Sequence, residues 1–194
     1  MPVVARKVIV ELPAPAMFAL VDGVESYPEF LPWCAGVEVF GRTAAETHAR
    51  IDIDFHGLKS HVATRNRNEP PEWIHLALAD GPFERLAGHW HIRPLGDDGC
   101  AVEFNLEYAF ASRTMEKILG PVFGHVVETL VERFVERAGR VSAGEVALPA
   151  CAPVPPPARA EPPLAVVLPS PVEPPSLAEP HAVPPDQLPP APST

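Results

Sequence analysis

The segment from residue 112 to residue 142 constrains the fold more than any other part of the sequence. Its apolar side chains recur every three or four positions, which predicts one long amphipathic helix. Ser112 or Thr114 can cap its start, whereas Gly120 and Pro121 predict a kink or a short separate first helix. The opposite face is expected to meet solvent and is charged: Glu128, Glu132, Arg133, Glu136, Arg137 and Arg140. So long an apolar stripe needs a broad apolar partner, which the preceding residues must supply.

The residues before this helix predict strands and two short helices. Residues 3–12 are rich in Val and Ile and predict a first strand, and the apolar spacing in 16–24 and 26–31 predicts two helices that end before Pro32. Six later stretches alternate between apolar and polar residues: 37–39, 49–55, 59–68, 73–80, 85–93 and 102–110. Turn signals such as Asp97-Asp98-Gly99 separate them.

This order, β-α-α-β6-α, predicts an α+β fold in which a curved antiparallel sheet wraps around the long C-terminal helix. Consecutive strands joined by tight turns favour antiparallel pairing, and only one face of each strand is apolar. A bent sheet that grips one helix leaves room for an internal pocket between the two layers. The sequence therefore predicts a helix-grip fold.

The end of the chain differs in composition from the rest. Of the 27 prolines, 17 lie in residues 146–194, a density that excludes helix and sheet. We expect one domain in residues 1–145 and a disordered Pro-rich tail in 146–194. The tail is interpreted either as a tether for a partner or a membrane, or as a solvated extension without a role of its own.

Charge and cysteine usage exclude several classes of protein. The formal net charge is −10, and residues 1–145 alone carry 14 Lys and Arg against 21 Asp and Glu, a charge of −7. An acidic domain of this kind excludes DNA as a partner. Cys34, Cys100 and Cys151 are too few and too scattered for a disulfide framework or a zinc site. No apolar run is long enough to span a membrane and no signal segment precedes the first strand, so a cytoplasmic location is expected.

Several polar groups could carry chemistry, but each has a simpler explanation. Cys34 has no base positioned beside it and is not expected to act as a nucleophile. His89 and His91 share a strand face and His75 could join them, but that face is the polar one, so a solvated surface is favoured over a metal site. Asp52 and Asp54 are likewise expected on the outer face rather than in a catalytic pair.

The main candidate site is the inward apolar set, which is either plain core or the wall of a cavity. Trp33 could lie at the cavity mouth or form a packed lid, Gly88 is expected to leave room, and Tyr108 offers a hydroxyl. The candidate ligand-binding residues are Phe30, Trp33, Ile53, Phe55, Leu76, Leu78, Phe83, Trp90, Phe104, Tyr108, Val122, Phe123, Val126, Leu130 and Phe134.

Three short blocks resemble a known family, the coenzyme Q-binding START-domain proteins and the bacterial RatA-like ribosome-association toxins. The blocks are VESYPEFLPWC at residues 24–34, Gly81-Pro82-Phe83 followed by Leu86, Gly88 and Trp90, and FVERA at residues 134–138. The resemblance covers residues 2–142. It implies a START-like helix-grip fold, a hydrophobic cavity, no conventional enzyme activity, and no cofactor beyond a bound ubiquinone or similar prenyl quinone or lipid.

Three functions are compatible with this resemblance. The first is a quinone carrier or chaperone that supports respiration, cytoplasmic or peripheral at the inner membrane near respiratory complexes. The second is a RatA-type toxin that binds the large ribosomal subunit and blocks subunit association. Its candidate RNA contacts are Arg50, Lys59, Arg65 and Arg67, although the acidic domain opposes phosphate binding. The third is a cyclase or aromatase, which would need convergent polar groups such as Tyr108, Thr64, Ser60 and Asn66.

Overall fold

The computed structural model describes residues 3–150. Apart from residues 146–150, the predicted Pro-rich tail lies outside the described residues. The described chain contains seven strands and two α-helices, with one 3-10 helix: β1 (Val3–Val10), α1 (Ala14–Asp22), η1 (Val24–Glu29), β2 (Cys34–Arg42), β3 (Glu46–Phe55), β4 (Leu58–Glu69), β5 (Trp73–Asp80), β6 (Phe83–Leu95), β7 (Gly99–Phe110) and α2 (Arg113–Ser142). The predicted order β-α-α-β6-α is confirmed.

All seven strands form one antiparallel sheet in the order β1-β7-β6-β5-β4-β3-β2. Each strand from β2 to β7 pairs with its neighbour in sequence, and β1 joins the far edge by pairing with β7 from Val3↔Glu107 to Val10↔Cys100. The β3–β4 hairpin turns at His56 and Gly57, whose positive φ angles of 52° and 82° suit a tight two-residue turn. Apart from β1, every strand therefore pairs with a strand that is next to it in the sequence.

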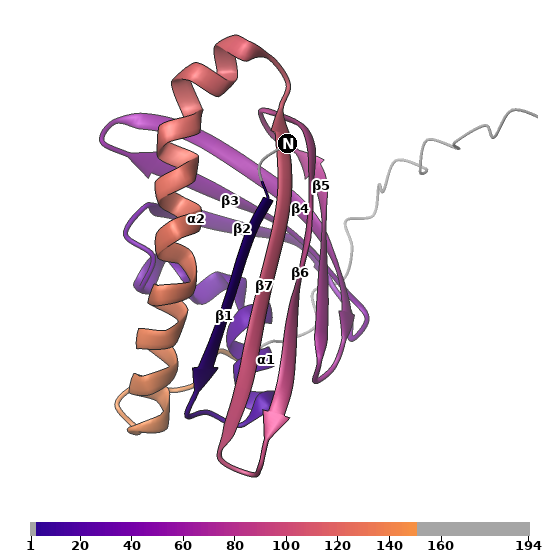
Figure 1. The fold of residues 1–194 in the computed structure, drawn as a ribbon, viewed down its shortest axis with the longest axis vertical. Helices are drawn as coiled ribbons and strands as arrows, with labels where there is room; N and C mark the ends of the chain where they lie inside the picture. Colours follow the sequence, from indigo (N-terminus) through magenta and orange to yellow (C-terminus); the bar gives the residue numbers. More distant parts are fainter. Residues whose placement is uncertain (1–2, 151–194) are drawn as a thin grey trace, which may run out of the picture. The chain divides into compact units, whose positions relative to one another are not determined.

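The sheet curves around α2, which runs along its concave face (Figure 1). The apolar stripe of α2 packs onto this face through buried Phe123, Val126, Val127, Val131 and Phe134. Figure 1 also shows α1 near the C-terminal half of α2, at one end of the sheet. This arrangement confirms the helix-grip fold and places the core between the helix and the inner face of the sheet.

Helix α2 begins as its sequence predicts and continues through its proline. The Ser112 hydroxyl accepts a hydrogen bond from the Met115 amide at 3.2 Å, which caps the first turn. Pro121 lies inside one continuous helix, so the alternative of a separate short helix is wrong. In Figure 1 the first turns of α2 lean away from the axis of the rest, in keeping with the predicted kink. No helix in residues 3–150 is long and apolar enough to cross a membrane.

The second short helix differs from its prediction. It is the 3-10 helix η1, which begins at Val24 rather than at Ser26 and contains Pro28. Proline has no amide hydrogen to donate, so a short i→i+3 turn accommodates it more easily than an α-helix does. Tyr27 from η1, the following Phe30 and Phe134 of α2 pack together in three edge-to-face contacts, one for each pair, with ring centroids 5.1 to 5.8 Å apart.

Arg137 was expected on the solvent face of the long helix, and this expectation is wrong. Its side chain is buried, pairs with the Glu29 carboxylate, and lies over the Phe30 ring at 5.3 Å from the centroid. The helical period places Arg137 beside Phe134, and the loop after η1 covers that part of the helix. The first and third sequence blocks therefore fold into one contact between η1 and α2.

Candidate functional site

A cavity of about 100 Å³ lies between the inner face of the sheet and α2. Apolar side chains make up most of its wall, and they come from η1, from β3 to β7 and from α2, together with Trp33 just before β2. The lining residues are Val24, Tyr27, Trp33, Ala49, Ile51, Ile53, Val62, Thr64, Asn66, Leu76, Leu86, Trp90, Phe104, Leu106, Phe123, Val126, Val127, Leu130 and Phe134.

Nine of the predicted ligand-binding residues line this cavity. They are Trp33, Ile53, Leu76, Trp90, Phe104, Phe123, Val126, Leu130 and Phe134. Their place follows from two periods that meet in the fold: alternate residues of each strand face α2, and one stripe of α2 faces the sheet. Their role as ligand contacts remains a prediction.

The other six predicted residues do not line this cavity. Phe30 packs in the aromatic contact with Tyr27 and Phe134. Phe83 and Val122 line a much smaller pocket, of about 10 Å³, which shares Ile53 and Phe123 with the main cavity.

The other three of these six are held by local contacts. Tyr108 lies edge-on to Phe83 and Phe123, with the Phe123 centroid 4.7 Å away. Burial, together with the nearby carboxylates of Glu116 and Glu128, raises the pKa of Tyr108. Phe55 packs against His125 at 4.9 Å, and Leu78 packs at the margin of the core.

The sequence prediction missed ten lining residues, for two different reasons. Val24, Ala49, Ile51, Val62, Leu86, Leu106 and Val127 follow the same periods as the predicted set, so their spacing could have identified them. Thr64 and Asn66 were considered only as groups for a cyclase, and Tyr27 only as a helix residue. Polar residue types on an inward strand face give no local signal that they meet a cavity.

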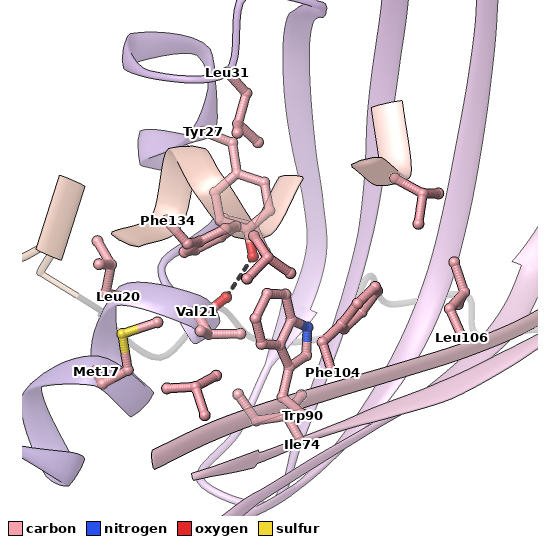
Figure 2. Close-up of a cluster of buried hydrophobic side chains, with 14 of the residues drawn as sticks. Met17, Leu20, Val21, Tyr27, Leu31, Ile74, Trp90, Phe104, Leu106 and Phe134 are labelled. Atoms are coloured by element: carbon pink, nitrogen blue, oxygen red, sulfur yellow. Dashed lines mark hydrogen bonds between the residues drawn. The ribbon is translucent and has the colours of Figure 1, made fainter. Parts of the chain in front are cut away.

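The cavity has one wall of packed rings (Figure 2). Trp90 lies 4.5 Å from Phe104 and 5.1 Å from Phe134 between ring centroids. The Tyr27 hydroxyl donates to the Val21 carbonyl at 2.6 Å, as the dashed line in Figure 2 marks. Tyr27 therefore presents an apolar ring, with its hydroxyl already engaged.

Two polar atoms of lining residues have no hydrogen-bond partner among the described residues. They are the indole Nε1 of Trp33 and the amide Oδ1 of Asn66, and both side chains are more than nine-tenths buried. Of the polar residues that a cyclase could use, Thr64 and Asn66 line the main cavity, Ser60 lines the smaller pocket, and Tyr108 lines neither. None of the described residues on the main cavity wall is acidic, basic or a histidine.

A buried polar network closes the fold beside η1. The Asp22 carboxylate accepts from the Thr47 hydroxyl at 2.7 Å and from the Asn68 amide at 2.9 Å, and Arg42 donates to the Glu25 carboxylate at 2.6 and 2.8 Å. Partial burial opposes ionisation of Glu25, but the hydrogen bonds and charge of Arg42 outweigh it and lower the pKa of Glu25. The network joins α1 and η1 to strands β2, β3 and β4.

The thiol, carboxylate and histidine side chains considered as catalytic or metal-binding candidates are each engaged in burial, an ion pair or ring packing. Burial is the main cause that raises the pKa of Cys34 to about 11, so the thiol is a poor nucleophile. Asp52 pairs with Arg50 at 2.7 Å. His75 and His91 lie parallel to the Trp73 ring, with His91 only 3.7 Å away, and His89 tilts against it. Within residues 3–150 no group of three or more His, Cys, Asp or Glu side chains could hold a metal ion.

The four candidate RNA contacts lie on the outer face of β3 and β4, each beside an acidic partner. Arg65 lies 3.1 Å from Glu46 and Arg67 lies 2.7 Å from Glu69. Lys59 lies 4.0 Å from Asp54, and Arg50 pairs with Asp52 as above. Because carboxylates alternate with the basic groups across this hairpin, the strands present a mixed surface rather than a basic patch.

Comparison with known proteins identifies a family and several relatives of this chain. The family profile described as "Polyketide cyclase / dehydrase and lipid transport" matches residues 10–135. The persistence and stress-resistance toxin PasT of Escherichia coli O6:H1 is 36% identical and the ribosome association toxin RatA of E. coli K12 is 35% identical, each over 141 residues that cover 73% of this chain and 89% of the relative.

Two more distant comparisons agree. The mitochondrial coenzyme Q-binding protein COQ10 homolog B of Xenopus laevis is 26% identical over 129 residues, which cover 64% of this chain and 53% of the relative. A START superfamily protein of Mycobacterium smegmatis superposes with a TM-score of 0.60 at 21% identity, over 72% of this chain and 98% of that structure, and it supports the fold alone. The chain belongs to the polyketide cyclase / dehydrase and lipid transport family and is related to the RatA proteins.

Proposed function

We propose that this protein binds an apolar ring-bearing ligand, such as a prenyl quinone, in the cavity between the sheet and α2, and acts as its carrier or chaperone. The observation that carries the proposal is the cavity itself. It has a predominantly apolar wall with closely packed aromatic rings, and none of the described wall residues is an Asp, Glu, Lys, Arg or His. The printed name of the COQ10 relative, a coenzyme Q-binding protein, supports this choice of ligand.

Affinity for such a ligand would come from removing its apolar surface from water. Burial contributes about 25 cal/mol per Å² of apolar area, so a substituted ring with part of an isoprenoid chain could bind without a charged contact. A binding role of this kind needs no catalytic residue. The proposal therefore includes the absence of enzymatic activity.

The cavity must widen to accept a quinone. At about 100 Å³ it is smaller than the roughly 150 Å³ engineered cavity that admits a benzene ring. Phe123 lines both this cavity and the smaller pocket, which Leu119 and Val122 also line. The first turns of α2 expose Met115 and Ile118, so these side chains have little packing to lose if this part of the helix moves outward and enlarges the cavity.

The test is native mass spectrometry together with organic extraction, on the full chain purified from its own host. We expect a bound mass that matches a prenylated quinone, and an increase in melting temperature when a short-chain quinone is added to protein that has been stripped of ligand. Protein that carries no ligand and shows no thermal shift with quinone would contradict the proposal.

A second candidate function is association with the ribosome, and it rests on the relatives named as ribosome association toxins at 35% identity. The test is cosedimentation with large ribosomal subunits at low salt, because screening weakens any contact with phosphate. A double variant, R65E/R67E, would abolish binding if these residues meet RNA, whereas R93E near the end of β6 in the same sheet serves as a control. Failure of the wild-type chain to cosediment would remove this candidate.

A further inference from the structure

The two unpartnered polar atoms of the cavity residues have opposite hydrogen-bonding character. The Trp33 indole nitrogen can only donate, and the Asn66 Oδ1 can only accept. Both are buried, and neither finds a partner among residues 3–150. A buried polar atom without a partner destabilises the folded state, so two of them on residues that line one cavity point to a partner from outside residues 3–150.

A polar side chain close to Asn66 on the same strand does form hydrogen bonds within the protein. Asn68 lies two residues from Asn66 on the same face of β4, and its amide nitrogen donates to Asp22 at 2.9 Å and to Thr47 at 3.3 Å. Asn68 keeps one unpaired oxygen but does not line the cavity. Asn66, opposite Thr47 in the sheet register, borders the cavity instead and has no such contact.

Trp33 is likewise fixed in place without engaging its indole nitrogen. Its carbonyl accepts from the Asp54 amide at 2.9 Å, and the next residue, Cys34, donates from its amide to the Leu31 carbonyl at 3.0 Å. The backbone around Trp33 is therefore held by strand β3 and by the end of the η1 segment. The Trp33 side chain lines the cavity, and its unpaired N–H is shielded from the open space, so a ligand reaches this donor when the cavity widens.

We propose that Trp33 and Asn66 recognise the ligand's polar groups and make the cavity select the reduced, hydroxyl-bearing form of a quinone. A quinone carries only acceptor oxygens, so it can satisfy the Trp33 N–H but leaves Asn66 Oδ1 unpaired. A quinol carries hydroxyl groups that both accept and donate. One oxygen accepts from Trp33 and the other hydroxyl donates to Asn66, which pairs both buried atoms.

This inference rests on the proposed function, because it assigns a redox preference to the same ligand site. The probes are tetramethyl-1,4-benzoquinone and its hydroquinone, titrated anaerobically by calorimetry into the full chain freed of ligand. The ring is fully substituted, so it does not add to cysteine thiols, and the two probes differ only in their oxygens. We expect the hydroquinone to bind at least about tenfold more tightly, as one additional buried hydrogen bond predicts.

Two variants separate the roles of the two residues. N66L removes the acceptor and is expected to abolish the preference by lowering only the hydroquinone affinity, about tenfold. W33F removes the donor and is expected to weaken both probes by a similar factor, because both carry an oxygen that accepts from the indole. N66L should melt at or above the wild-type temperature without ligand because it removes an unpaired buried group, whereas W33F also loses the packing of the buried indole and should melt lower.

Matched controls come from the outer face of the sheet. N105L and W73F make the same chemical changes away from the cavity and should leave both affinities unchanged. Equal affinities for the two probes, or tighter binding of the quinone as a donating Asn66 amide would produce, overturn the inference and leave the proposed function standing. Failure of both probes to bind contradicts the proposed function as well. The ratio of the wild-type affinities for the hydroquinone and the quinone tests the inference even if a variant does not fold.

Discussion

At the scale of single residues, burial decides the chemistry of the thiols. Cys34 follows Trp33 at the start of β2, its thiol donates weakly to the Gly36 carbonyl at 3.6 Å, and Cys100 is fully buried in β7. Burial disfavours a thiolate, and the Asp52 carboxylate adds to this at Cys34. A residue type that often acts as a nucleophile serves here as a small apolar side chain.

We therefore predict that Cys34 and Cys100 are unreactive in the folded protein. With a pKa of about 11, roughly one Cys34 in a thousand is a thiolate at pH 8, and this fraction rises about tenfold per pH unit up to about pH 10. The measurement is labelling by a disulfide reagent in a C151S variant, with and without denaturant. Complete labelling of the native variant within seconds at pH 8 would show that the thiols are not protected.

Gly88 also has a different role from the one its sequence position suggests. It was expected to leave room on the inner face of β6, but a Cβ at this position would come 2.2 Å from the Asn105 carbonyl oxygen and 3.1 Å from the Leu106 Cα. The space is filled by the backbone of β7. The expectation is wrong because a missing side chain lets a neighbouring strand approach closely rather than leaving a void.

From this geometry G88A should lower the free energy of unfolding by about 1–3 kcal/mol, as overpacking does in a close-packed core. The matched control is G36A in β2, where the nearest atom to an added Cβ is Asp52 Oδ2 at 3.8 Å. That substitution should be neutral or slightly stabilising, since alanine restricts the unfolded chain. Urea unfolding measures both, and equal effects of the two substitutions would refute this account of Gly88.

At the scale of elements, the contact between η1 and α2 explains why two distant sequence blocks occur together. Phe134 packs against Tyr27 and Phe30, and Arg137, one turn further along α2, pairs with Glu29. Apolar and ionic contacts therefore fall on the same helical stripe. The contact fixes the end of the sheet where Tyr27 meets the cavity.

The ion pair should respond asymmetrically to the loss of either partner. E29Q leaves the buried Arg137 charge without its anion and should lower the free energy of unfolding by about 1–3 kcal/mol, less than for a fully buried pair because Glu29 is exposed. R137M keeps the apolar stem and leaves Glu29 in water, so it should change stability by less than about 1 kcal/mol. Urea unfolding at neutral pH measures the loss of stability in each variant. A larger loss for R137M than for E29Q would contradict this prediction.

At the scale of the whole molecule, the cavity results from the way the sheet and α2 pack against each other, and no single element forms it. Eight segments of the chain contribute to its wall, and the helix and sheet each bring side chains that would pack fully if the layers were closer. A protein interior normally leaves few voids of this size, because each unfilled volume costs contacts. The retained space is the main reason to infer a bound ligand.

A larger side chain that fills the cavity should stabilise the folded protein and at the same time prevent ligand binding. Ala49 is buried and lines the cavity, so A49L should raise the melting temperature of the free protein by filling part of the void, equivalent to about 1 kcal/mol. The same variant should lose the thermal shift that a quinone gives the wild-type chain. The control, A109L, places the same side chain on the outer face of β7 and should keep that shift. If A49L retains the full shift, the ligand does not occupy this cavity.

The sequence by itself determined the order of the elements and the face that each strand and helix turns inward. These follow from local periods of two and 3.6 residues, from the Ser112 cap and from the glycine turns, all of which act between near neighbours. The same periods identified nine cavity residues correctly. They could not separate Trp90, which borders the void, from Tyr108, which is enclosed by Phe83 and Phe123.

Only the tertiary structure decided where the layers leave space and which charges meet. The size of the cavity, the approach of β7 to Gly88 and the burial of Arg137 depend on contacts between segments far apart in the sequence. The same holds for Trp33 and Asn66, whose unpaired atoms are recognised only when every neighbouring donor and acceptor is in place. The physical reason is that periodicity sets direction, whereas distance between layers is set by the packing of all their side chains at once.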